Sequence, residues 1–473
     1  MKSGTSETNP VLAYGAWLAS ADDGWPQGAL TAAQDAFMDT LGVAIPGAAE
    51  PVTRKVFETV RGWGQGPCTV IGAGARLAAP WAALINGTAA HALDFDDNFD
   101  PAKAHASAVL VPAILALAEQ EGASGGACLD AYIAGLQIMG RVGQGLNPAH
   151  RNRGWHATAT AGAVGAAAAC TRLLRLPEGE AAYALSISTS MAGGFMSQFG
   201  TMTKPLHAGL AAKAGVIAAS LARAGIDAGL HTLDGPTGMN RLMVGPDLDA
   251  LRADLTQVEH GQTLRFETAS VGEPLLIVSS GLKVKRFPNC GSAHRAMDGL
   301  LALKERHGIA GAEIAEVRVS APASHLANLM YREPRNAAQA KFSLEYALAT
   351  IALYGRCTLA DFEETAVVRD EVRAFFPRVR RDPVDKPEGA FPTRVEVTLG
   401  DGTSYRTEVE MPVGSLAAPL SSRQYEAKFN ECAAYFIAAD ELADLKRSLS
   451  SLATLKSIAT VMDRLAPAGT NDG

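Results

Sequence analysis

The first 268 residues of this chain are filled by a succession of apolar segments with helical spacing, and this feature constrains the fold more than any other. Apolar residues that recur every three to four positions place one face of a helix in a core. Alanine and glycine are abundant here, and such small side chains let neighbouring helix axes come close. We therefore expect a compact domain of many interior helices. The segments are residues 34–43, 81–93, 108–119, 129–140, 158–174, 178–190 and 206–224.

Alternating segments appear in the second half of the chain. Residues 314–321 alternate apolar and polar side chains, which is typical of a strand with one buried face. Residues 393–410 contain two alternating runs on either side of a Gly-Asp-Gly sequence, which predicts a β-hairpin. The spacing in residues 342–354 and 360–367 predicts helices, and the charged, proline-bearing residues 379–392 are expected to form an exposed loop.

Helical spacing returns near the C-terminus, in residues 421–439 and 440–465. Ser421 and Asp440 are suitable N-terminal caps for these helices. We expect the two helices to pack back on the first domain, which makes the α+β part an insertion.

The predicted fold class is therefore mainly α. We expect a large all-helical domain formed by residues 1–268 and 412–473. A smaller α+β lid domain, residues 269–411, is inserted before the C-terminal helices. Clefts between domains are common places for small-ligand sites.

Composition excludes several classes of protein. The 473 residues carry a net charge of −7 with lysine and arginine dispersed, so nucleic acid is not an expected partner. The first ten residues lack the regions of a signal peptide, and we find no apolar window of about 20 residues to span a bilayer. The six cysteines are scattered without a C-x-x-C pair, which favours a reducing cytoplasm and argues against a cysteine-ligated metal centre. We expect a cytoplasmic protein that contacts no membrane.

The densest group of polar residues is the segment HALDFDDNFDPAKAH, residues 91–105, directly before an apolar helical segment. One aspartate is expected to cap that helix, which would account for Asp100. This explanation fits Asp94 and Asp97 poorly, because they flank Phe95 in an apolar context. A metal site built from aspartate and histidine is a minority alternative, since the spacing of an EF-hand is absent.

Two further groups lie at helix starts. His156 precedes a helix that has no charged side chain before Arg172, and a lone histidine in this setting is more often structural than catalytic. Thr203 and Lys204 lie where a loop bounded by glycine and proline enters a helix, a place that binds anions. Thr203 would also serve there as an ordinary N-terminal cap.

Two more groups lie in the second half of the chain. The segment GLKVKRFPNCGSAH contains Lys285, Ser292 and His294, and it could bind a carboxylate or form a basic edge strand followed by a capped helix. Tyr331 lies beside two arginines in the segment MYREPR, for which a solvated loop is the simpler interpretation.

Together these groups place histidine, lysine, arginine and tyrosine near aspartate, as a small polyanionic substrate would require. Lysine and arginine neutralise carboxylates. A histidine or lysine tuned by burial and a neighbouring aspartate removes a proton next to a carboxylate. The motifs of dinucleotide binding, P-loop phosphate binding and the serine nucleophile elbow are absent from the sequence.

In combination and in order, the stretches around these groups resemble the MmgE/PrpD family over nearly the whole chain. The resemblance implies proton chemistry on a small di- or tricarboxylate without metal or organic cofactor. It also implies a large helical domain, a smaller lid domain and a homodimer. Activities of the family include 2-methylcitrate dehydratase, cis-aconitate decarboxylase and iminodisuccinate epimerase. The matching stretches are residues 86–97, 105–119, 154–160, 199–209, 285–294, 333–349 and 412–429.

The resemblance also suggests roles for single residues. His156 or Lys204 would be the base that takes a proton, and Asp94 would orient it and tune its pKa. His105 would bind or polarise a carboxylate, and Tyr331 would return a proton on the other face. The candidate substrate-binding residues are Asn98, Thr203, Lys285, Ser292 and His294, and no metal ligand is predicted.

Three functions stay open at this point. A lyase, either dehydratase-like or decarboxylase-like, is the leading hypothesis. An epimerase of an iminodisuccinate-like dicarboxylate is the alternative, because residues 199–205 and 330–335 look closer to the epimerase-like members. Asn98 also stands where decarboxylase and dehydratase members tend to have threonine. The third hypothesis is a carboxylate-binding protein without catalytic activity, although such a protein would not need a buried base such as His156.

Overall fold

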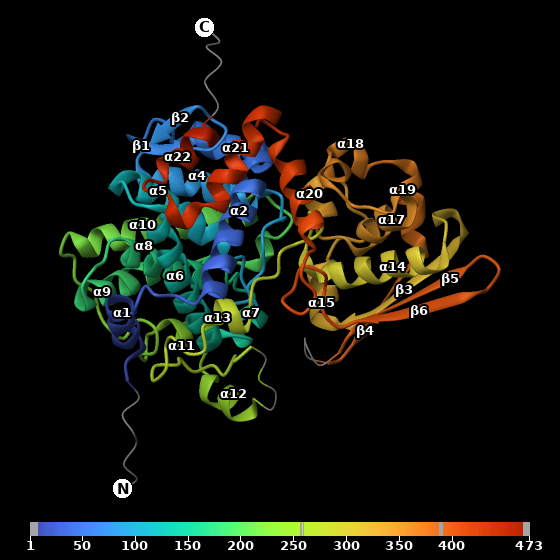
Figure 1. The fold of residues 1–473 in the computed structure, drawn as a ribbon. Coiled ribbons are helices and arrows are strands. Elements are labelled where there is room, and N and C mark those ends of the chain that lie inside the picture. The colour runs from blue at the N-terminus through green and yellow to red at the C-terminus, as the bar shows by residue number, and fades with distance from the viewer. Residues whose placement is uncertain (1–7, 256–257, 259, 387–390, 467–473) are drawn as a thin grey trace. The chain divides into compact units, whose positions relative to one another are not determined.

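The computed structural model describes residues 8–255, 258, 260–386 and 391–466, and it divides into two compact units (Figure 1). Unit 1 comprises Met1–Ser197, Thr203–Leu282 and Glu426–Gly473, and unit 2 comprises Gln198–Met202 and Lys283–Tyr425. The chain thus leaves unit 1 after Leu282 and returns after Tyr425, whereas the sequence led us to place these changes after residues 268 and 411.

Unit 1 is built mainly from helices, as its apolar periodicity predicts. Every helical segment expected in the first 268 residues overlaps an observed helix. Its N-terminal helices are α1 (Pro10–Ser20), α2 (Gln27–Ala48), α3 (Pro51–Val60), α4 (Ala79–Ala92), α5 (Ser107–Glu121), α6 (Gly125–Leu146), α7 (Ala149–Asn152), α8 (Thr160–Leu173), α9 (Glu178–Thr189), α10 (Thr203–Arg223), α11 (Met239–Val244), α12 (Leu248–Asp254) and α13 (Leu276–Ser279).

Glycine and alanine set the close approach of the helices that carry the polar groups. A Cβ atom on Gly209 of α10 would lie 2.1 Å from the carbonyl oxygen of Leu84 in α4. A Cβ atom on Gly215, also in α10, would lie 2.4 Å from the Cβ of Ala166 in α8. Because these distances are far shorter than van der Waals contact, α10 holds its position only with glycine at both places.

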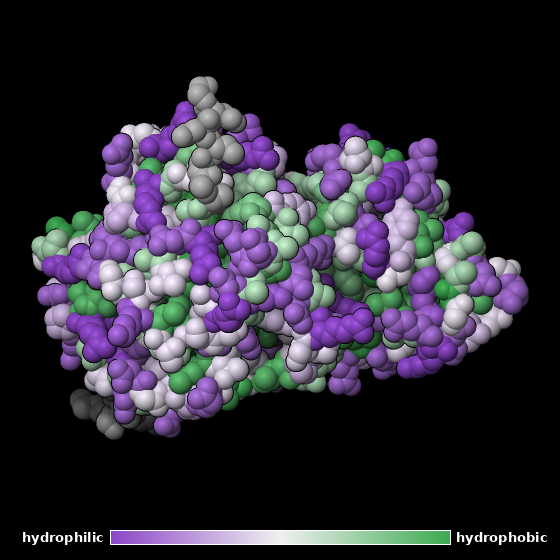
Figure 2. Space-filling model, turned by 45° about the horizontal axis from the view of Figure 1, so that its top comes forward, coloured by the Kyte–Doolittle hydropathy of each residue, from purple (hydrophilic) through white to green (hydrophobic). Residues whose placement is uncertain are grey.

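Helix α10 is also long and apolar enough to cross a membrane, a length of apolar sequence that we did not expect. Its apolar window is 67% buried within the protein, as in the core helix of a globular protein. The face shown in Figure 2 is covered largely by hydrophilic side chains, with apolar ones scattered among them. This distribution agrees with apolar helix faces that are directed inward.

The prediction that the larger domain is entirely helical is wrong in one detail. Strands β1 (Gln65–Val70) and β2 (Ala75–Leu77) pair antiparallel in a small hairpin. The sequence of β1, QGPCTV, lacks a regular alternation of apolar and polar residues, so it carries no strand signal.

Unit 2 contains a four-stranded sheet with the order β4-β3-β5-β6. Strand β3 (Ile314–Pro322) pairs antiparallel with β5 (Thr393–Leu399), which forms the predicted hairpin with β6 (Ser404–Val409). Valines of β3 and β5 share a core with α14 and α17. The helices of this unit are α14 (His294–His307), α15 (Ala323–Asn328), α16 (Ala337–Ala340), α17 (Leu344–Tyr354), α18 (Glu364–Val367) and α19 (Asp370–Phe375).

The remaining strand corrects our expectation of a loop over residues 379–392. Strand β4 (Val379–Val384) pairs in parallel with β3 at the edge of the sheet. Charged residues and proline are common on edge strands, where they discourage pairing with other chains, and they hid this strand from sequence analysis. Residues 387–390 lie outside the described part of the chain.

The C-terminal helices are shorter than predicted. They are α20 (Ser422–Ala433), α21 (Ala439–Ser450) and α22 (Ala459–Met462). Ser421 caps α20 as expected, since its Oγ accepts a hydrogen bond from the backbone N–H of Gln424 at 3.3 Å. Asp440 lies inside the first turn of α21 and is not its cap. An acidic residue in this turn still interacts favourably with the helix dipole.

Candidate active site

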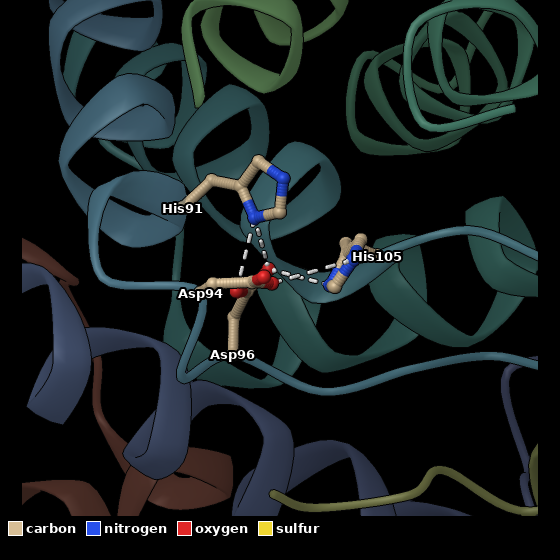
Figure 3. Close-up of side chains that lie close together, drawn as sticks. All are labelled: His91, Asp94, Asp96 and His105. Atoms are coloured by element: carbon tan, nitrogen blue, oxygen red, sulfur yellow. Dashed lines mark hydrogen bonds and ion pairs between the residues drawn. The ribbon is translucent and has the colours of Figure 1, made fainter. Parts of the chain in front are cut away.

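The loop between α4 and α5 gathers two histidines and two aspartates in the interior of unit 1 (Figure 3). His91 lies in the last turn of α4, and the chain then turns at Asp94, which has a left-handed φ of 53°. Aspartate adopts this conformation more readily than most residues. The turn directs the side chain of Asp94 back toward His91 and His105.

The carboxylate of Asp96 joins the two histidines. Its Oδ2 lies 2.9 Å from Nδ1 of His91 and 3.2 Å from Nδ1 of His105. Nδ1 of His105 also lies 3.0 Å from the carbonyl oxygen of Asp97, which only accepts hydrogen bonds. Nδ1 of His105 therefore carries a proton, and Nε2 is the nitrogen on the side of Asp94.

Asp97 attaches this loop to the start of α5. Its carboxylate accepts hydrogen bonds from the backbone N–H of Ser107, at 3.2 Å, and from the Ser107 hydroxyl. Asp97 therefore accepts the hydrogen bond from the first backbone N–H of α5, whereas the sequence suggested Asp100 for this role. Burial raises the pKa of Asp97 to about 7, although the hydrogen bonds from Ser107 oppose this shift.

Lys204 enters the cluster from the first turn of α10. Its Nζ lies 3.0 Å from Oδ1 of Asp94 and 3.1 Å from Nε2 of His91. The residue is only 4% exposed, and the carboxylate of Asp94 compensates its buried charge. Nε2 of His105 lies 3.7 Å from the same oxygen of Asp94. One carboxylate thus holds an ammonium and an imidazole side by side.

His156 and His207 form a second pair of buried rings. Their Nδ1 atoms lie 3.0 Å apart, so one nitrogen carries a proton and the other accepts it. Burial lowers the pKa of both histidines, and the charge of Lys204 lowers it further. His156 is therefore neutral near pH 7 and has the protonation state of a base. The rings of His156 and His91 lie 6.2 Å apart, which places this pair beside the first cluster.

Two of the predicted binding residues belong to unit 1. Asn98 is half-buried on the same loop as Asp97. Thr203 is the first residue of α10 and directly precedes Lys204. Both lie next in sequence to residues of the cluster.

The other four predicted residues belong to unit 2. Lys285 and His294 are buried, and Nε2 of His294 lies 3.3 Å from the carbonyl oxygen of Asn289. The Ser292 hydroxyl accepts a hydrogen bond from the Asn328 side chain at 2.9 Å. The Tyr331 hydroxyl donates to the carbonyl oxygen of Phe199 at 3.2 Å. The site within unit 1 is therefore made by the other predicted residues, Asp94, His105, His156 and Lys204.

Two family models match most of the chain. The MmgE/PrpD N-terminal domain matches residues 18–250, which contain the whole buried cluster, and the MmgE/PrpD C-terminal domain matches residues 287–451. The chain belongs to the MmgE/PrpD family. The resemblance seen in the sequence motifs is thereby confirmed.

Relatives within the MmgE/PrpD family share about a quarter of their residues with this chain. The human protein named cis-aconitate decarboxylase is 26% identical over 451 residues, which cover 89% of this chain and 86% of the human protein. The mouse protein of the same name is 27% identical, covering 90% of this chain and 87% of its own length. The cis-aconitate decarboxylase of Aspergillus terreus (strain NIH 2624 / FGSC A1156) is 26% identical, covering 94% and 93%. These relatives support a lyase activity of the MmgE/PrpD kind.

Sequence reasoning gave no role to His91, Asp96 or His207, although all three are buried in this MmgE/PrpD site. His91 and Asp96 were visible as members of the densest polar segment. His207 lies one helical turn after Lys204, so both side chains are on the same side of α10. Spacing alone could have identified His207, but the hydrogen bonds that join His91 to Asp96 and Lys204 required the structure.

Four side chains of the cluster have the geometry to hold a metal ion. His91, Asp94, Asp96 and His105 each offer a ligand atom, and these atoms lie within 4.8 Å of one another. The ammonium of Lys204, 3.0 Å from Asp94, already supplies a positive charge at this place. A divalent cation beside it would meet electrostatic repulsion in a buried environment. A site without metal therefore stays our prediction for this protein.

Proposed function

We propose that this protein is a cofactor-independent lyase that decarboxylates a small unsaturated tricarboxylate, with cis-aconitate as the first substrate to test. The observation that carries the proposal is the contact of the Asp94 carboxylate with both the Lys204 ammonium and the His105 imidazole. This arrangement offers a cation for a carboxylate and a proton donor beside it. The names of the relatives supply the choice of acid.

The proposed reaction is a decarboxylation with a shift of the double bond. The bond between the methylene carbon and its carboxylate breaks, and carbon dioxide leaves. The electron pair of that bond forms a new double bond, and the pair of the old double bond takes a proton at the far carbon. Atoms and electrons balance without any oxidant or reductant, so the protein needs to supply only a proton and charge stabilisation.

His105 is the proposed proton donor. Its Nδ1 donates to the Asp97 carbonyl oxygen, while the carboxylates of Asp94 and Asp96 lie 3.7 and 3.2 Å from the ring nitrogens. When both ring nitrogens carry protons, the positive charge of the ring lies beside these two carboxylates. A proton on Nε2 is then available for transfer to carbon.

Lys204 is the residue that we propose to bind a substrate carboxylate. His156 is a neutral histidine that could act as a base. Lys204 is held by Asp94 and His91, which fixes the position of its charge before substrate arrives. Neutral His156 would remove a proton from carbon if the reaction were a dehydration or an epimerisation. Lys285 and Tyr331 stay predictions from the sequence as further substrate contacts.

Proton NMR of the purified protein in D₂O, with cis-aconitate, 2-methylcitrate, citrate and iminodisuccinate, tests this proposal. We expect cis-aconitate to lose carbon dioxide and to give a product with one deuterium at the carbon that was protonated. The same product after EDTA treatment would exclude an essential metal. A dehydrated product from citrate or 2-methylcitrate would replace decarboxylation with dehydration. Loss of the α-proton signal alone would indicate an epimerase.

The variant His105→Gln is the control for this experiment. We expect it to remain folded and to lose turnover by about 10²- to 10⁴-fold, the usual contribution of a general acid. Unchanged turnover in this variant would reject His105 as the proton donor. Binding of these acids in calorimetry without any turnover by the wild type would favour the carboxylate-binding hypothesis over an enzyme.

A further inference from the structure

Lys428 brings a buried charge from the C-terminal helix α20 to the loop that carries the aspartates of the site. The residue is 7% exposed, and its Nζ lies 2.7 Å from Oδ1 of Asp39 in α2, which is 5% exposed. The same Nζ donates a hydrogen bond of 2.9 Å to the carbonyl oxygen of Phe95 and lies 4.2 Å from the centre of the Phe95 ring. The proposed reaction gives no role to Lys428 or Asp39.

Phe95 separates the two aspartates that contact the proposed proton donor. Asp94 and Asp96 lie 3.7 and 3.2 Å from the ring nitrogens of His105. The carbonyl of Phe95 belongs to the planar peptide unit that leads directly into Asp96. A hydrogen bond to this carbonyl therefore restricts the direction in which the backbone enters Asp96.

Two further contacts hold the ends of the same loop. The backbone N–H of Asp94 donates to the carbonyl oxygen of His91 at 3.1 Å, and the carboxylate of Asp97 accepts from the backbone N–H of Ser107 at 3.2 Å. Lys428 adds a contact between these two ends, from the side of α2 and α20. Each such contact removes conformations that the loop would otherwise adopt.

We propose that Lys428 is a positioning residue for the loop of Asp94 and Asp96, and that Asp39 holds its ammonium in place. The carboxylate of Asp39 compensates a charge that would otherwise be costly to bury, and the ring of Phe95 adds a cation–π contact. That the position of this loop matters for a reaction rests on the proposed function.

Loss of the contact to Phe95 would let the two aspartates move relative to His105. Asp96 contacts Nδ1 of His105 and Asp94 faces Nε2, so a shift of the loop changes the surroundings of both ring nitrogens. A misplacement of about 1 Å costs about 100-fold in rate, even when it is caused far from the chemistry.

Three variants separate the positioning of the loop from the stability of the fold. Lys428→Met leaves Asp39 buried without its cation, so we expect a lower melting temperature and a kcat lower by about 10- to 100-fold in the D₂O assay. In Lys428→Met/Asp39→Asn the uncompensated charge is gone, so the melting temperature should return toward the wild type while kcat stays low. Asp39→Asn keeps the bond from Lys428 to Phe95, so we expect a lower melting temperature but a kcat within about threefold of the wild type.

A pair that served only the stability of the fold would make kcat follow the melting temperature in all three variants, and this result would overturn the proposal. A wild-type kcat in the double variant would overturn it as well. The matched control is Arg172→Met/Asp130→Asn, because Arg172 also joins a carboxylate, Asp130 at 2.8 Å, to a backbone carbonyl, that of Leu18 at 3.0 Å. This contact lies at the C-terminal end of α8, so we expect kcat to change by about twofold or less.

A second measurement does not depend on turnover. In nitrogen NMR of protein labelled with ¹⁵N-histidine, the ring signals of His105 are those that disappear in His105→Gln. We expect them to shift in Lys428→Met/Asp39→Asn and to keep their wild-type positions in the control. Unchanged His105 signals in the Lys428 double variant would reject the positioning role. A shift in a protein that converts none of the tested acids would reject the proposed function and leave the positioning of the loop by Lys428 intact.

Discussion

Lys204 and Asp94 form an ion pair in which both side chains are 5% exposed. Removing one partner from such a pair leaves the other charge buried without compensation, which costs about 3–5 kcal/mol. We therefore expect Lys204→Met to lower the free energy of unfolding by this amount and to abolish turnover. Urea denaturation and the D₂O assay measure the two effects separately.

The double variant Lys204→Met/Asp94→Asn tests the cause of that loss. Neutralising Asp94 removes the uncompensated charge, so stability should return toward the wild type while turnover stays absent. If the single variant were as stable as the wild type, the pair would not carry its charges in the folded protein. If the double variant were less stable than the single one, packing would explain the loss better than electrostatics.

The sequence identified these residues as members of a site, but it did not identify the contacts between them. Asp94, His105, His156 and Lys204 were predicted as one site, and the structure brings them together within unit 1. Their roles depend on which nitrogen faces which carboxylate, and periodicity contains no such information. Asp97 illustrates the difficulty, because four aspartates within seven residues compete for one helix start and only the fold selects among them.

At the scale of elements, α10 keeps its place through Gly209. A Cβ atom there would lie 2.1 Å from the Leu84 carbonyl oxygen and 2.4 Å from Oγ1 of Thr88. We expect Gly209→Ala to push α10 away from α4 and to destabilise the protein by about 1–3 kcal/mol. Turnover should fall as well, because Lys204 lies at the start of the same helix. Thermal melts and kcat/KM measure these effects.

Gly179 in α9 provides the matched control, because a Cβ atom there would meet nothing within 4 Å. We expect Gly179→Ala to change the free energy of unfolding by about 0.5 kcal/mol or less. Equal melting temperatures for Gly209→Ala and the wild type would mean that the crossing of α4 and α10 is looser than the structure indicates.

The sequence predicts the helices and strands in which apolar residues recur at a regular spacing. It does not predict the elements that lack such a spacing. The helices of unit 1 and the hairpin of β5 and β6 follow apolar patterns of period 3.6 and 2. The sequence of β4 predicts a loop because it contains arginine, aspartate and proline, and the edge position of the strand in the sheet tolerates these residues. The 440–465 segment was predicted as one helix, but the chain breaks after α21 at Ser450.

At the scale of the whole molecule, the sequence indicated two parts but not their limits. The compact units change after Leu282 and Tyr425, each 14 residues later than the limits expected after residues 268 and 411. Residues 198–202 belong to unit 2, although the chain on both sides of them belongs to unit 1. So short a segment has no recognisable pattern of apolar and polar residues in the sequence. The homodimer implied by the family stays a prediction, as does the cytoplasmic location.

Buried histidines make the stability of the whole molecule depend on pH. Burial lowers the pKa of His91 and His150 to about 3 and also lowers that of His156, from an ordinary value of 6.5. Below pH 6.5 the unfolded chain therefore binds protons that the folded protein does not bind. Each such histidine lowers the free energy of unfolding by about 1.4 kcal/mol for every pH unit below 6.5. Its stabilising effect is fully present above that pH.

The titration of Asp97 changes the free energy of unfolding with pH in the opposite direction. Burial raises its pKa from 3.8 to about 7, so between these values the folded protein holds a proton that the unfolded chain has lost. The stability due to this group is fully present below pH 3.8 and is lost as the pH rises toward 7. Among these four groups the three histidines outweigh the aspartate, so their combined contribution to stability falls as the pH is lowered from about 6.5 to 4.

Urea denaturation between pH 4 and 8 measures this dependence, and two variants separate its parts. His150→Gln keeps a polar partner for the Thr160 hydroxyl, which lies 2.9 Å from Nε2 of His150, but removes one titrating ring. We expect it to reduce the slope below pH 6.5 by about 1.4 kcal/mol per pH unit. Asp97→Asn removes the opposing group and should steepen the slope by a similar amount. A wild-type stability that is constant from pH 4 to 6.5 would mean that these histidines become protonated inside the folded protein, and the neutral state assigned to His91 and His156 would then be wrong.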